Sequence, residues 1–361
     1  MGSNSFGTLL QITTWGESHG KAIGVVIDGC PAGLEISDED IRKALKRRSP
    51  GNHPLTSPRQ EPDLAEILSG VFEGKTTGAP ISILIPNTHA DSSKYDLVKH
   101  LLKPGHANYT YLEKYGIFDH RGGGRASARE TACRVAAGAI AQKLLNHFGV
   151  SCVAYLAQVE NIHADVDLSN LDHIASSSIF CPDPLKEEEM KQKIAEAQES
   201  GDSLGAVIGF VALGLPAGLG DPVYEKLEAN LAKAMLSIPA TKGFEIGSGF
   251  ASSSMQGSSH NDAFFCEGGK VMTRTNHAGG VLGGISTGMP LLGSIAFKPT
   301  SSIYKEKETL SLDKQPSVFH LPSGSKHDPC VAIRAVPVVE AMLALVLADA
   351  LLLNRSSRLF I

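Results

Sequence analysis

Five short segments spread along the chain combine glycine or proline with side chains that bind anions or carry protons. They read GESHG, KPGHAN, GGGRASARETA, KPTSSI and KHDPC, and span residues 16–20, 103–108, 122–132, 298–303 and 326–330. One such segment alone constrains little. Five of them predict a fold that gathers distant parts of the chain around one composite site. Because they lie on both sides of every plausible boundary, we expect residues 1–361 to form a single domain.

The composition is that of an ordinary soluble globular protein. The 361 residues are 42% hydrophobic and 20% charged, which is enough apolar material for a large core. The formal net charge is −5, so an extended nucleic-acid surface is not expected. Any anion site must therefore depend on local arginine, lysine and histidine side chains.

Neither the cysteines nor the apolar stretches point to export or to a membrane. The six cysteines are far apart and form no CxxC pair, which argues against a disulfide framework and a zinc site. The N-terminus has no basic start followed by an apolar run, so we expect a cytoplasmic protein. The apolar stretch 336–353 contains Pro337, Glu340 and Asp349, which favours a buried helix over a membrane span.

Hydrophobic periodicity predicts strands and helices in mixed order. Strand patterns occur at 22–28, 79–85 and 206–215, and helix patterns at 37–48, 126–148 and 223–237. Ser37 is the expected cap of the first helix, and a surface helix is expected after Pro184. The elements do not alternate strictly, as a parallel sheet requires, so an α+β fold is favoured over a doubly wound one.

Two histidines lie in tight turns. His19 is flanked by glycines just before a predicted strand, where an imidazole can face a pocket and protonate a leaving group. His106 follows the turn residues Pro104 and Gly105, with Lys103 near enough to reach the same anion. The alternatives stay open at this level. They are a turn histidine bonded to the backbone for His19 and a solvated surface turn for His106.

The segment 122–132 carries the strongest local signal. Three glycines lead into a predicted helix whose first turns carry Arg125, Ser127 and Arg129. Free N–H groups, the positive end of the helix dipole and the arginine side chains together make an anion site. A capping box formed by Ser127 and Glu130 is the plainer interpretation. The two are compatible, because a cap does not use the arginines.

Three further positions carry weaker signals. Arg48 ends a predicted helix, where a solvated cation is the default. Lys298 opens a Lys-Pro-Thr-Ser-Ser run that suits a phosphate contact. Asp328 can act as an acid–base group, although an aspartate before a proline more often forms a turn.

Familiar nucleotide and metal motifs are missing. The glycine-rich run at 275–288 is not GxGxxG and precedes a strand-like segment, so it lacks the context of a Rossmann site. The chain has no P-loop, and no histidine or cysteine cluster has the spacing of metal ligands. We therefore expect no metal.

Taken together, these motifs resemble those of the chorismate synthase family over nearly the full length of the chain. The segments occur in the family's order: GESHG, RRSPGN, SGVFEGKTTGAPI, PGHANYTY, YGIFDHRGGGRASARETACRVAAGAIA, SIPATKGFEIGSGF, NHAGGVLGGISTG, KPTSSI and HDPCVAIRAVPVVEAM. Agreement across so many segments is far beyond chance.

The resemblance implies a lyase that completes the shikimate pathway. Such enzymes convert 5-enolpyruvylshikimate 3-phosphate to chorismate and phosphate by a 1,4-anti elimination. They need reduced FMN although no net redox change occurs. Part of the family reduces the flavin itself with NADPH, which keeps NADPH as a candidate external reductant here. The compact spacing of the motifs favours the members that rely on flavin reduced elsewhere.

The family's site residues carry over by position. His19 would protonate the leaving phosphate, His106 would protonate the reduced flavin, and Asp328 would work with flavin N5 in removing the C6 proton. The substrate-binding cations would be Arg48, Lys103 and Arg129. The flavin contacts would be Arg125, Ala126, Ser127, Pro239, Ala240, Gly283, Lys298, Pro299, Thr300, Ser301, Ser302 and Lys326.

The resemblance also implies an architecture. It is a β–α–β sandwich, with helices packed between two antiparallel sheets, assembled as a homotetramer. No nucleic-acid or membrane partner is implied.

Some positions depart from the usual family pattern. Lys103 and Lys326 stand where arginine is common, and lysine lacks the bidentate fork of arginine. Asn108 stands where aspartate is common. These changes predict altered anion binding.

At residue 54 a proline replaces a substrate-binding arginine of many relatives, and His53 or Arg59 would compensate for that missing cation. We expect activity to be retained, because both histidines and Asp328 are present.

A flavin- or nucleotide-binding protein without lyase activity is the alternative from another class. It would explain the glycine-rich segments and the cations, but it has no need of proton carriers in three separate motifs. Such a binder would change the flavin absorbance without releasing phosphate.

Overall fold

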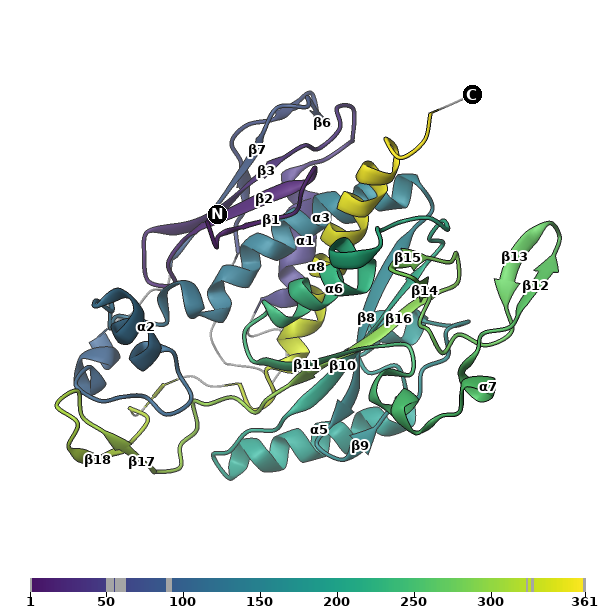
Figure 1. Ribbon diagram of the computed structural model, residues 1–361. Helices are drawn as coiled ribbons and strands as arrows, with labels where there is room; N and C mark the ends of the chain where they lie inside the picture. Colours follow the sequence, from purple (N-terminus) through teal and green to yellow (C-terminus); the bar gives the residue numbers. More distant parts are fainter. Residues whose placement is uncertain are drawn as a thin grey trace.

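Two antiparallel sheets with helices between them form the body of the molecule (Figure 1). The structure, a computed structural model, describes residues 2–49, 55, 63–88, 93–322, 324–325 and 328–359. Both sheets and the helices between them contribute to one continuous hydrophobic core. This arrangement confirms the predicted α+β sandwich.

The first sheet has the strand order β1-β2-β3-β7-β4, with antiparallel neighbours throughout. Its strands are β1 (Ser5–Phe6), β2 (Gln11–Gly16), β3 (Ala22–Asp28), β7 (Ile81–Pro86) and β4 (Glu66–Ile67). In β7 every second residue is buried, because successive side chains of a strand point to opposite faces. The strand predicted at 22–28 is confirmed, and the one predicted at 79–85 begins two residues later.

The second sheet has the strand order β11-β16-β10-β8-β9, again antiparallel. Its strands are β11 (Thr241–Ile246), β16 (Leu291–Phe297), β10 (Ala206–Leu213), β8 (Ser151–Val159) and β9 (Ile162–His163). Strand β10 confirms the strand predicted at 206–215, and it ends at Leu213 because Gly214 turns the chain with a φ of +76°.

The helices between the sheets are α1 (Asp38–Arg48), α3 (Thr131–His147), α6 (Leu227–Leu236) and α8 (Ala332–Asn354). Helix α3 lies against strands of the first sheet, and α8 packs on α3 and on β8 and β10. Helix α8 is long and apolar enough to cross a membrane by those criteria alone, with a mean hydropathy of 2.2, but 78% of that window is buried. A helix that is apolar on all sides must be covered on all sides. The buried helix predicted here is confirmed.

Side-chain caps decide where two of these helices begin. Ser37 accepts from the Asp40 amide, and the Asp40 carboxylate accepts from the Ser37 amide, so α1 starts with the expected cap. The capping box expected for Ser127 and Glu130 is wrong. Ser127 accepts from the Arg129 amide at 3.3 Å and caps only a short 3-10 turn, while the Glu130 carboxylate faces other partners. The long helix therefore begins at Thr131 rather than at 126.

Smaller elements surround this sandwich. Helix α5 (Pro184–Glu199), capped by Asp183, is the predicted surface helix and buries one face that includes Met190 and Ile194. The remaining helices are α2 (Asn108–Tyr115), α4 (Asp172–Ser176) and α7 (Gly257–His260). The remaining strands are β5 (Val71–Phe72), β6 (Lys75–Thr76), β12 (Phe264–Glu267), β13 (Lys270–Thr273), β14 (Val281–Leu282), β15 (Ile285–Ser286), β17 (Lys307–Leu310) and β18 (Pro316–Phe319).

Five 3-10 turns complete the described elements. They are η1 (Ser93–Val98), η2 (Gly124–Ala126), η3 (Ala128–Glu130), η4 (Val223–Glu225) and η5 (Gly249–Ser254). The helix predicted at 223–237 is therefore divided into η4 and α6.

A substitution at the contact between α3 and α8 tests this packing. A Cβ added at Gly138 would lie 2.4 Å from the Ala341 Cβ and 2.6 Å from the Ala341 Cα, so the two helix backbones would have to separate. We expect Gly138→Ala to lower the free energy of unfolding by about 1–3 kcal/mol, as measured by urea denaturation. Gly257→Ala is the matched control, because its Cβ would meet nothing within 4 Å. Equal stabilities of the two variants would contradict this account of the core.

Candidate active site

Segments almost two hundred residues apart meet around His106. The turn before α2 holds Lys103, Gly105 and His106, and residues 298–302 follow strand β16. The Lys298 Nζ donates to the Gly105 carbonyl at 3.3 Å and to the Ser301 Oγ at 2.7 Å. The His106 Nε2 lies 3.0 Å from the Ser302 Oγ. The KPGHAN and KPTSSI motifs therefore form one wall of a site.

The hydrogen bonds of His106 identify its tautomer. Its Nδ1 lies 3.0 Å from the Pro104 carbonyl, which can only accept, so Nδ1 carries a proton. In the neutral ring, Nε2 then accepts from the Ser302 hydroxyl. Loss of water around the ring, and then the charges of Lys103, Lys298 and Lys307, hold the pKa of His106 below its ordinary value.

Lys103, Lys298 and Lys307 concentrate positive charge at this wall. Burial is the first cause that lowers the pKa of each lysine. Within the described part of the chain, none of the three forms a salt bridge. The Thr300 hydroxyl is buried beside them without a hydrogen-bond partner among these residues. A site with surplus cations and an unsatisfied hydroxyl suits a phosphate. Lys307 was missed from the sequence because it lies in no recognisable motif.

A second cationic centre is built on two buried arginines that share one carboxylate. The Arg48 Nη2 lies 2.5 Å from the Asp63 Oδ2, and the Arg129 Nη1 contacts the Asp63 Oδ1. The exposed fractions of the Arg48 and Arg129 side chains are 2% and 4%. The solvated helix end that was the default for Arg48 is therefore wrong. The Arg48 Nε is buried and has no partner among the described residues.

Asp63 is charged because of these arginines. Burial alone would raise the pKa of its carboxyl, but the charges of Arg48 and Arg129 and their hydrogen bonds lower it to about 2. Its two oxygens therefore accept from two different guanidinium groups. Asp63 was missed from the sequence, since an isolated aspartate outside every motif carries no distinctive signal.

Asp328 joins the same centre through Arg334. The Arg334 Nη1 lies 2.8 Å from the Asp328 Oδ2, and its Nε donates to the Arg48 carbonyl at 3.4 Å. Arg334 is in the first turn of α8, so the helix itself positions the aspartate. Sequence analysis did not single out Arg334.

His19 lies beside η1, which carries Tyr95. Its Nδ1 is 3.0 Å from the Ser18 hydroxyl, and its ring meets the Tyr95 ring edge-on at 5.2 Å. The Lys103 Nζ lies over the same Tyr95 ring, 4.5 Å from its centre. A Cβ at Gly122 would lie 2.1 Å from the His19 Nδ1, so only glycine allows the GGGR segment to approach this close. Tyr95 therefore links the histidine to the lysine wall.

Asn87 connects His19 to the arginines. Its side-chain nitrogen donates to the carbonyls of Glu17 and Gly20, which flank His19, at 3.0 and 2.9 Å. Its oxygen accepts from the Arg129 Nε at 2.9 Å. One amide thus sets the position of the GESHG loop relative to the buried arginine.

Arg125 is placed differently from the other cations. Its guanidinium donates to the carbonyls of Gly16 and Thr14 at 3.0 and 3.1 Å and to the Asn4 side chain. These bonds occupy the fork and tie η2 to strand β2. In this arrangement the Arg125 guanidinium is engaged by protein groups.

Ala240 lies beside the lysine wall. Its φ is +72°, a left-handed conformation that is unusual for alanine, and its carbonyl accepts from the Lys298 amide at 2.9 Å. Pro239 precedes it in the loop between α6 and β11.

Gly283 is not brought to this wall. It lies in the hairpin turn between β14 and β15, where the Gly284 carbonyl accepts from the Leu227 amide at the start of α6. Ala240 follows the other end of α6, and a helix of this length spans about 15 Å. Lys326, Pro54, His53 and Arg59 lie outside the described residues.

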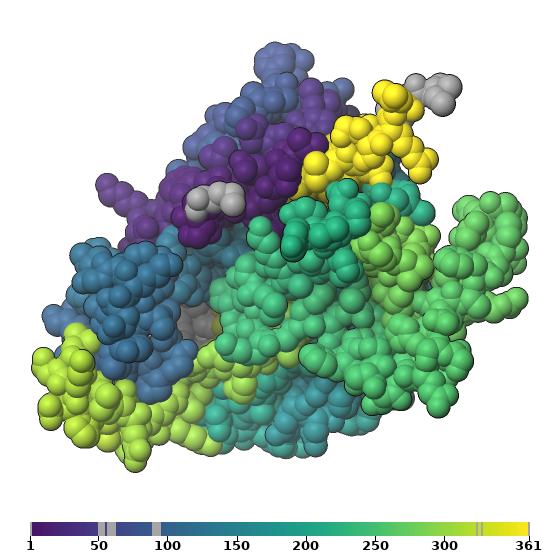
Figure 2. Space-filling view, viewed as in Figure 1, coloured from purple at the N-terminus to yellow at the C-terminus, as the bar shows by residue number. Residues whose placement is uncertain are grey.

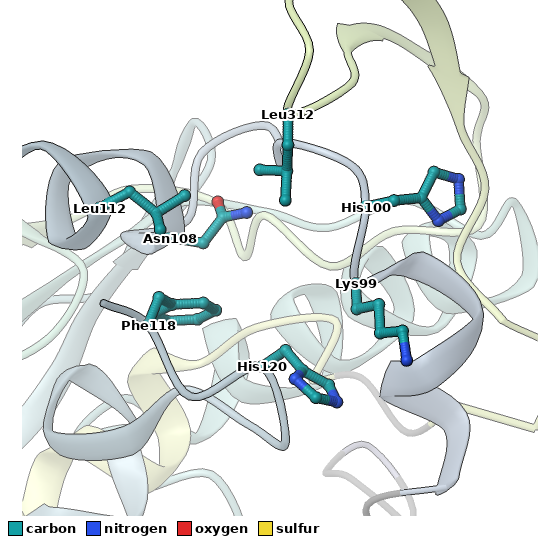
Figure 3. Close-up of a pocket in the computed structure, with 7 residues that line it drawn as sticks. All are labelled: Lys99, His100, Asn108, Leu112, Phe118, His120 and Leu312. Atoms are coloured by element: carbon teal, nitrogen blue, oxygen red, sulfur yellow. The ribbon is translucent and has the colours of Figure 1, made fainter. Parts of the chain in front are cut away.

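A cavity of about 380 Å³ opens beside α2 (Figure 3). It is lined by Lys99, His100, Asn108, Leu112, Phe118, His120 and Leu312, and none of the catalytic candidates lines it. Asn108 accepts from the Lys103 amide at 3.1 Å and donates to the Leu101 carbonyl at 3.0 Å. A carboxylate could not make the second bond. The amide therefore suits this position, where relatives often have aspartate, and helps to shape the Lys103 turn.

The space-filling view shows a recess between the α2 region, in blue, and the α6–β11 region, in green (Figure 2). Among the described residues, no three His, Cys, Asp or Glu side chains gather where they could hold a metal ion. The arrangement therefore offers two cationic centres, two histidines and one carboxylate. Those groups can bind a substrate with several anionic groups and move protons on it.

The shared carboxylate makes a stability prediction with a definite pH dependence. We expect Asp63→Asn to lower the free energy of unfolding at pH 7 by about 3–5 kcal/mol, because it leaves two buried arginines without their counterion. The pKa of Asp63 falls from 3.8 to about 2 on folding. Its stabilising contribution is therefore present above about pH 4 and is lost as the pH falls toward 2. The difference in free energy of unfolding between wild type and Asp63→Asn should therefore be smaller at pH 3 than at pH 7, as measured by urea unfolding.

Asp119→Asn is the control. The hydrogen bond and charge of Arg121 also lower the pKa of Asp119 to about 2, but this pair is exposed. Its loss should cost less than about 1 kcal/mol. If Asp63→Asn lowers the free energy of unfolding as little as Asp119→Asn does, or by an amount that does not change with pH, Asp63 is not a buried counterion.

Comparison with known proteins agrees with this geometry. The family model for chorismate synthase matches residues 10–352. The chain is 57% identical to the chorismate synthase of Protochlamydia amoebophila, with 99% of this chain and 100% of that one aligned. It is 50% identical to the enzyme of Methanosarcina mazei, over 98% and 97% of the two chains. A crystal structure of chorismate synthase matches with a TM-score of 0.77 and 33% identity, covering 97% of this chain and 94% of the other. The chain belongs to the chorismate synthase family.

Proposed function

We propose that the chain converts 5-enolpyruvylshikimate 3-phosphate to chorismate and phosphate at the composite site described above. The observation that carries this assignment is the pairing of two separate cationic centres with His19, His106 and Asp328, linked through Tyr95, Asn87 and Arg334. A substrate with two carboxylates and a phosphate needs several cations at once, and it needs proton carriers at both ends of an elimination.

The lysine wall fits the flavin cofactor that the family requires. Lys298, Lys307 and the Thr300 hydroxyl would hold its phosphate. The two lysines would supply positive charge, and the buried Thr300 hydroxyl would supply a donor that has no partner among the described residues. The backbone of Ala240 and of the turn 125–127 would contact the rest of the molecule. When bound, reduced FMN lends electron density to the substrate and recovers it after phosphate leaves.

The arginine centre fits the substrate's anionic groups. Asp63 bonds to both Arg48 and Arg129, and the buried Arg48 Nε has no partner among the described residues. Lys103, held over the Tyr95 ring, supplies a third cation beside His19. Preorganised donors of this kind stabilise developing charge without reorganising during the reaction.

The proton carriers divide between the two ends of the elimination. His19 would donate to the leaving phosphate, and its ring is oriented by Ser18 and Tyr95. Asp328, held by Arg334, would accept the C6 proton. His106 holds its proton at Nδ1, where the Pro104 carbonyl fixes the ring beside the lysine wall.

The remaining assignments follow the family resemblance. The chain would be a single domain, work in the cytoplasm and assemble as a homotetramer, with NADPH as a candidate external reductant. Exposed apolar side chains support assembly, because monomers seldom leave such residues uncovered in groups. Leu64, Leu68 and Phe72 on or near the first sheet, with Phe264 and Val271 on the β12–β13 hairpin, are of this kind.

Anaerobic phosphate release tests the function. Wild-type protein is mixed with 5-enolpyruvylshikimate 3-phosphate and chemically reduced FMN, and again without FMN, while chorismate absorbance is recorded. Turnover only with reduced FMN is expected. Tight FMN binding without phosphate release would overturn the lyase assignment and favour the non-catalytic flavin binder.

Removal of one lysine tests the phosphate subsite. We expect Lys307→Met to weaken FMN binding about tenfold, since a charged hydrogen bond contributes about 1.5–3 kcal/mol, as measured by fluorescence titration. Lys305→Met is the matched control, because that exposed lysine pairs with Asp202 instead. Equal affinities for both variants would remove Lys307 from the site.

A further inference from the structure

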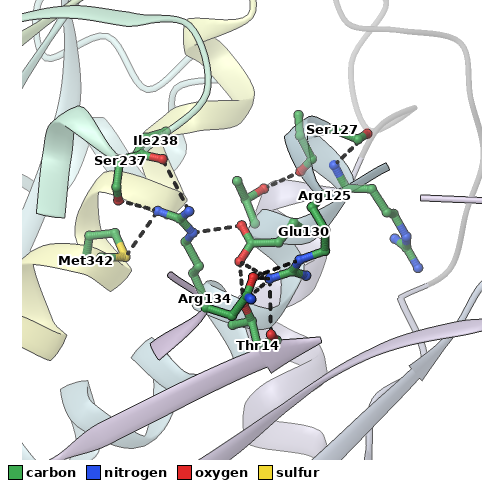
Figure 4. Close-up of polar contacts among 12 residues, drawn as sticks. Thr14, Arg125, Ser127, Glu130, Arg134, Ser237, Ile238 and Met342 are labelled. Atoms are coloured by element: carbon green, nitrogen blue, oxygen red, sulfur yellow. Dashed lines mark hydrogen bonds and ion pairs between the residues drawn. The ribbon is translucent and has the colours of Figure 1, made fainter. Parts of the chain in front are cut away.

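Glu130 occupies a buried junction between three parts of the fold that carry site residues (Figure 4). It stands at the end of η3, directly before α3. Its Oε1 accepts from the Thr14 hydroxyl at 2.7 Å, on strand β2, and its Oε2 accepts from the Arg134 Nε at 2.8 Å. The carboxylate thus connects a strand of the first sheet to the central helix.

Arg134 extends this connection to the loop after α6. Its Nη1 donates to the Ser237 hydroxyl at 2.6 Å, and its Nη2 donates to the Ser237 carbonyl at 3.2 Å. The Met342 sulfur of α8 lies 3.9 Å from Nη1. Ser237 ends α6, and Pro239 and Ala240 follow it in the chain. The guanidinium fork therefore holds the start of the segment that ends at Ala240.

Arg125 closes the network on the opposite side. Its Nη2 donates to the same Thr14 hydroxyl at 2.6 Å and lies 3.8 Å from the Glu130 Oε1. The turn 125–127 and the end of β2, which leads to His19, are joined to Glu130 in this way. Three proposed site segments, far apart in sequence, converge on one buried carboxylate.

The conformation of Ala240 indicates that this junction holds the loop in place as well as packing side chains together. A non-glycine residue at a φ of +72° costs about 1 kcal/mol or more and persists only where the surroundings hold it. The Ala240 carbonyl also accepts from the Lys298 amide. Any shift of the loop at Ser237 would thus reach the lysine wall.

We infer that Glu130 and Arg134 are positioning residues that fix the flavin-contact segments 125–127 and 239–240 relative to each other. The Glu130 oxygens accept from Thr14 and Arg134, and the Arg134 fork spans Glu130 and Ser237, so both side chains act through the segments that they join. The inference rests on the proposed function, because only that function makes both segments part of one cofactor site.

The first test needs no ligand. In Arg134→Lys a single ammonium replaces the fork and cannot reach Glu130 and Ser237 together. Hydrogen–deuterium exchange of the protein without added flavin should then be about tenfold faster at the amides of 240–241, with helix α5 unchanged. Arg42→Lys, at the exposed Asp38 pair, is the matched control and should exchange like wild type. Unchanged exchange at 240–241 in folded Arg134→Lys would overturn the inference.

The second test separates positioning from general damage. FMN binding by Arg134→Lys should weaken about tenfold, while the KM for 5-enolpyruvylshikimate 3-phosphate at saturating flavin stays within about twofold. Ser237→Ala removes one exposed hydroxyl, which accepts from Arg134 and donates to the Ala234 carbonyl. This variant should fold and is expected to weaken FMN binding about threefold. Wild-type affinity in Ser237→Ala, or equal losses for flavin and substrate in Arg134→Lys, would also overturn the inference.

The two tests distinguish failure of the inference from failure of the proposed function. If wild type releases no phosphate with reduced FMN but exchange at 240–241 still responds to Arg134→Lys, the proposed function fails and the link is structural only. If wild type is active and exchange does not respond, the function stands and the positioning role is excluded.

Discussion

The burial of helix α8 on every side is the constraint on which the rest of the structure depends. A helix without a polar face cannot lie on the surface, so a sheet and further helices must cover it. Helices α1, α3 and α6 and strands β8 and β10 of the second sheet do so, and Gly138 lets α3 approach α8 to contact distance. This packing also sets the ends of the central helices. Arg48 ends α1, Arg129 and Glu130 precede α3, and Asp328 precedes α8. The helical layer thus presents its charged ends to one site.

The two cationic centres of that site differ in whether a carboxylate pairs with their positive charges. The arginine centre is buried, and Asp63 bonds to both of its guanidinium groups, so their positions are set before any ligand arrives. The lysine wall forms no salt bridge among the described residues. Burial lowers the pKa of each of its lysines, and for Lys307 the charge of Lys298 lowers the pKa further while that of Asp202 opposes the shift. A bound phosphate would relieve the repulsion between Lys298 and Lys307. In the proposed assignment, the cofactor subsite would use the charge of unpaired lysines, whereas the substrate centre would use preorganised donors.

Local signals succeeded where the chemistry was local. The strand at 22–28, the Ser37 cap and the buried helix near 336–353 follow from periodicity, capping and hydropathy, and each is confirmed. Ser127 and Glu130 have the spacing of a capping box, yet Glu130 bonds to Thr14 and Arg134 instead. The buried Glu130 carboxylate bonds to partners that are distant in sequence rather than to the start of its own helix. Residue spacing cannot reveal such partners.

The sequence by itself determined the fold class, the family and the residue types that carry the chemistry, because motif order, periodicity and glycine-rich turns are properties of the chain. Only the tertiary structure decided which charges remain available. Arg125 and Arg129 are four residues apart in one motif, but the first is tied to β2 and the second shares Asp63 with Arg48. Lys307 joins the site although it lies in no motif, and Arg334 joins it although nothing in its segment marked it as a site residue. The physical reason is that charge pairing depends on distances of a few ångströms between side chains, which are set by packing and not by separation along the chain.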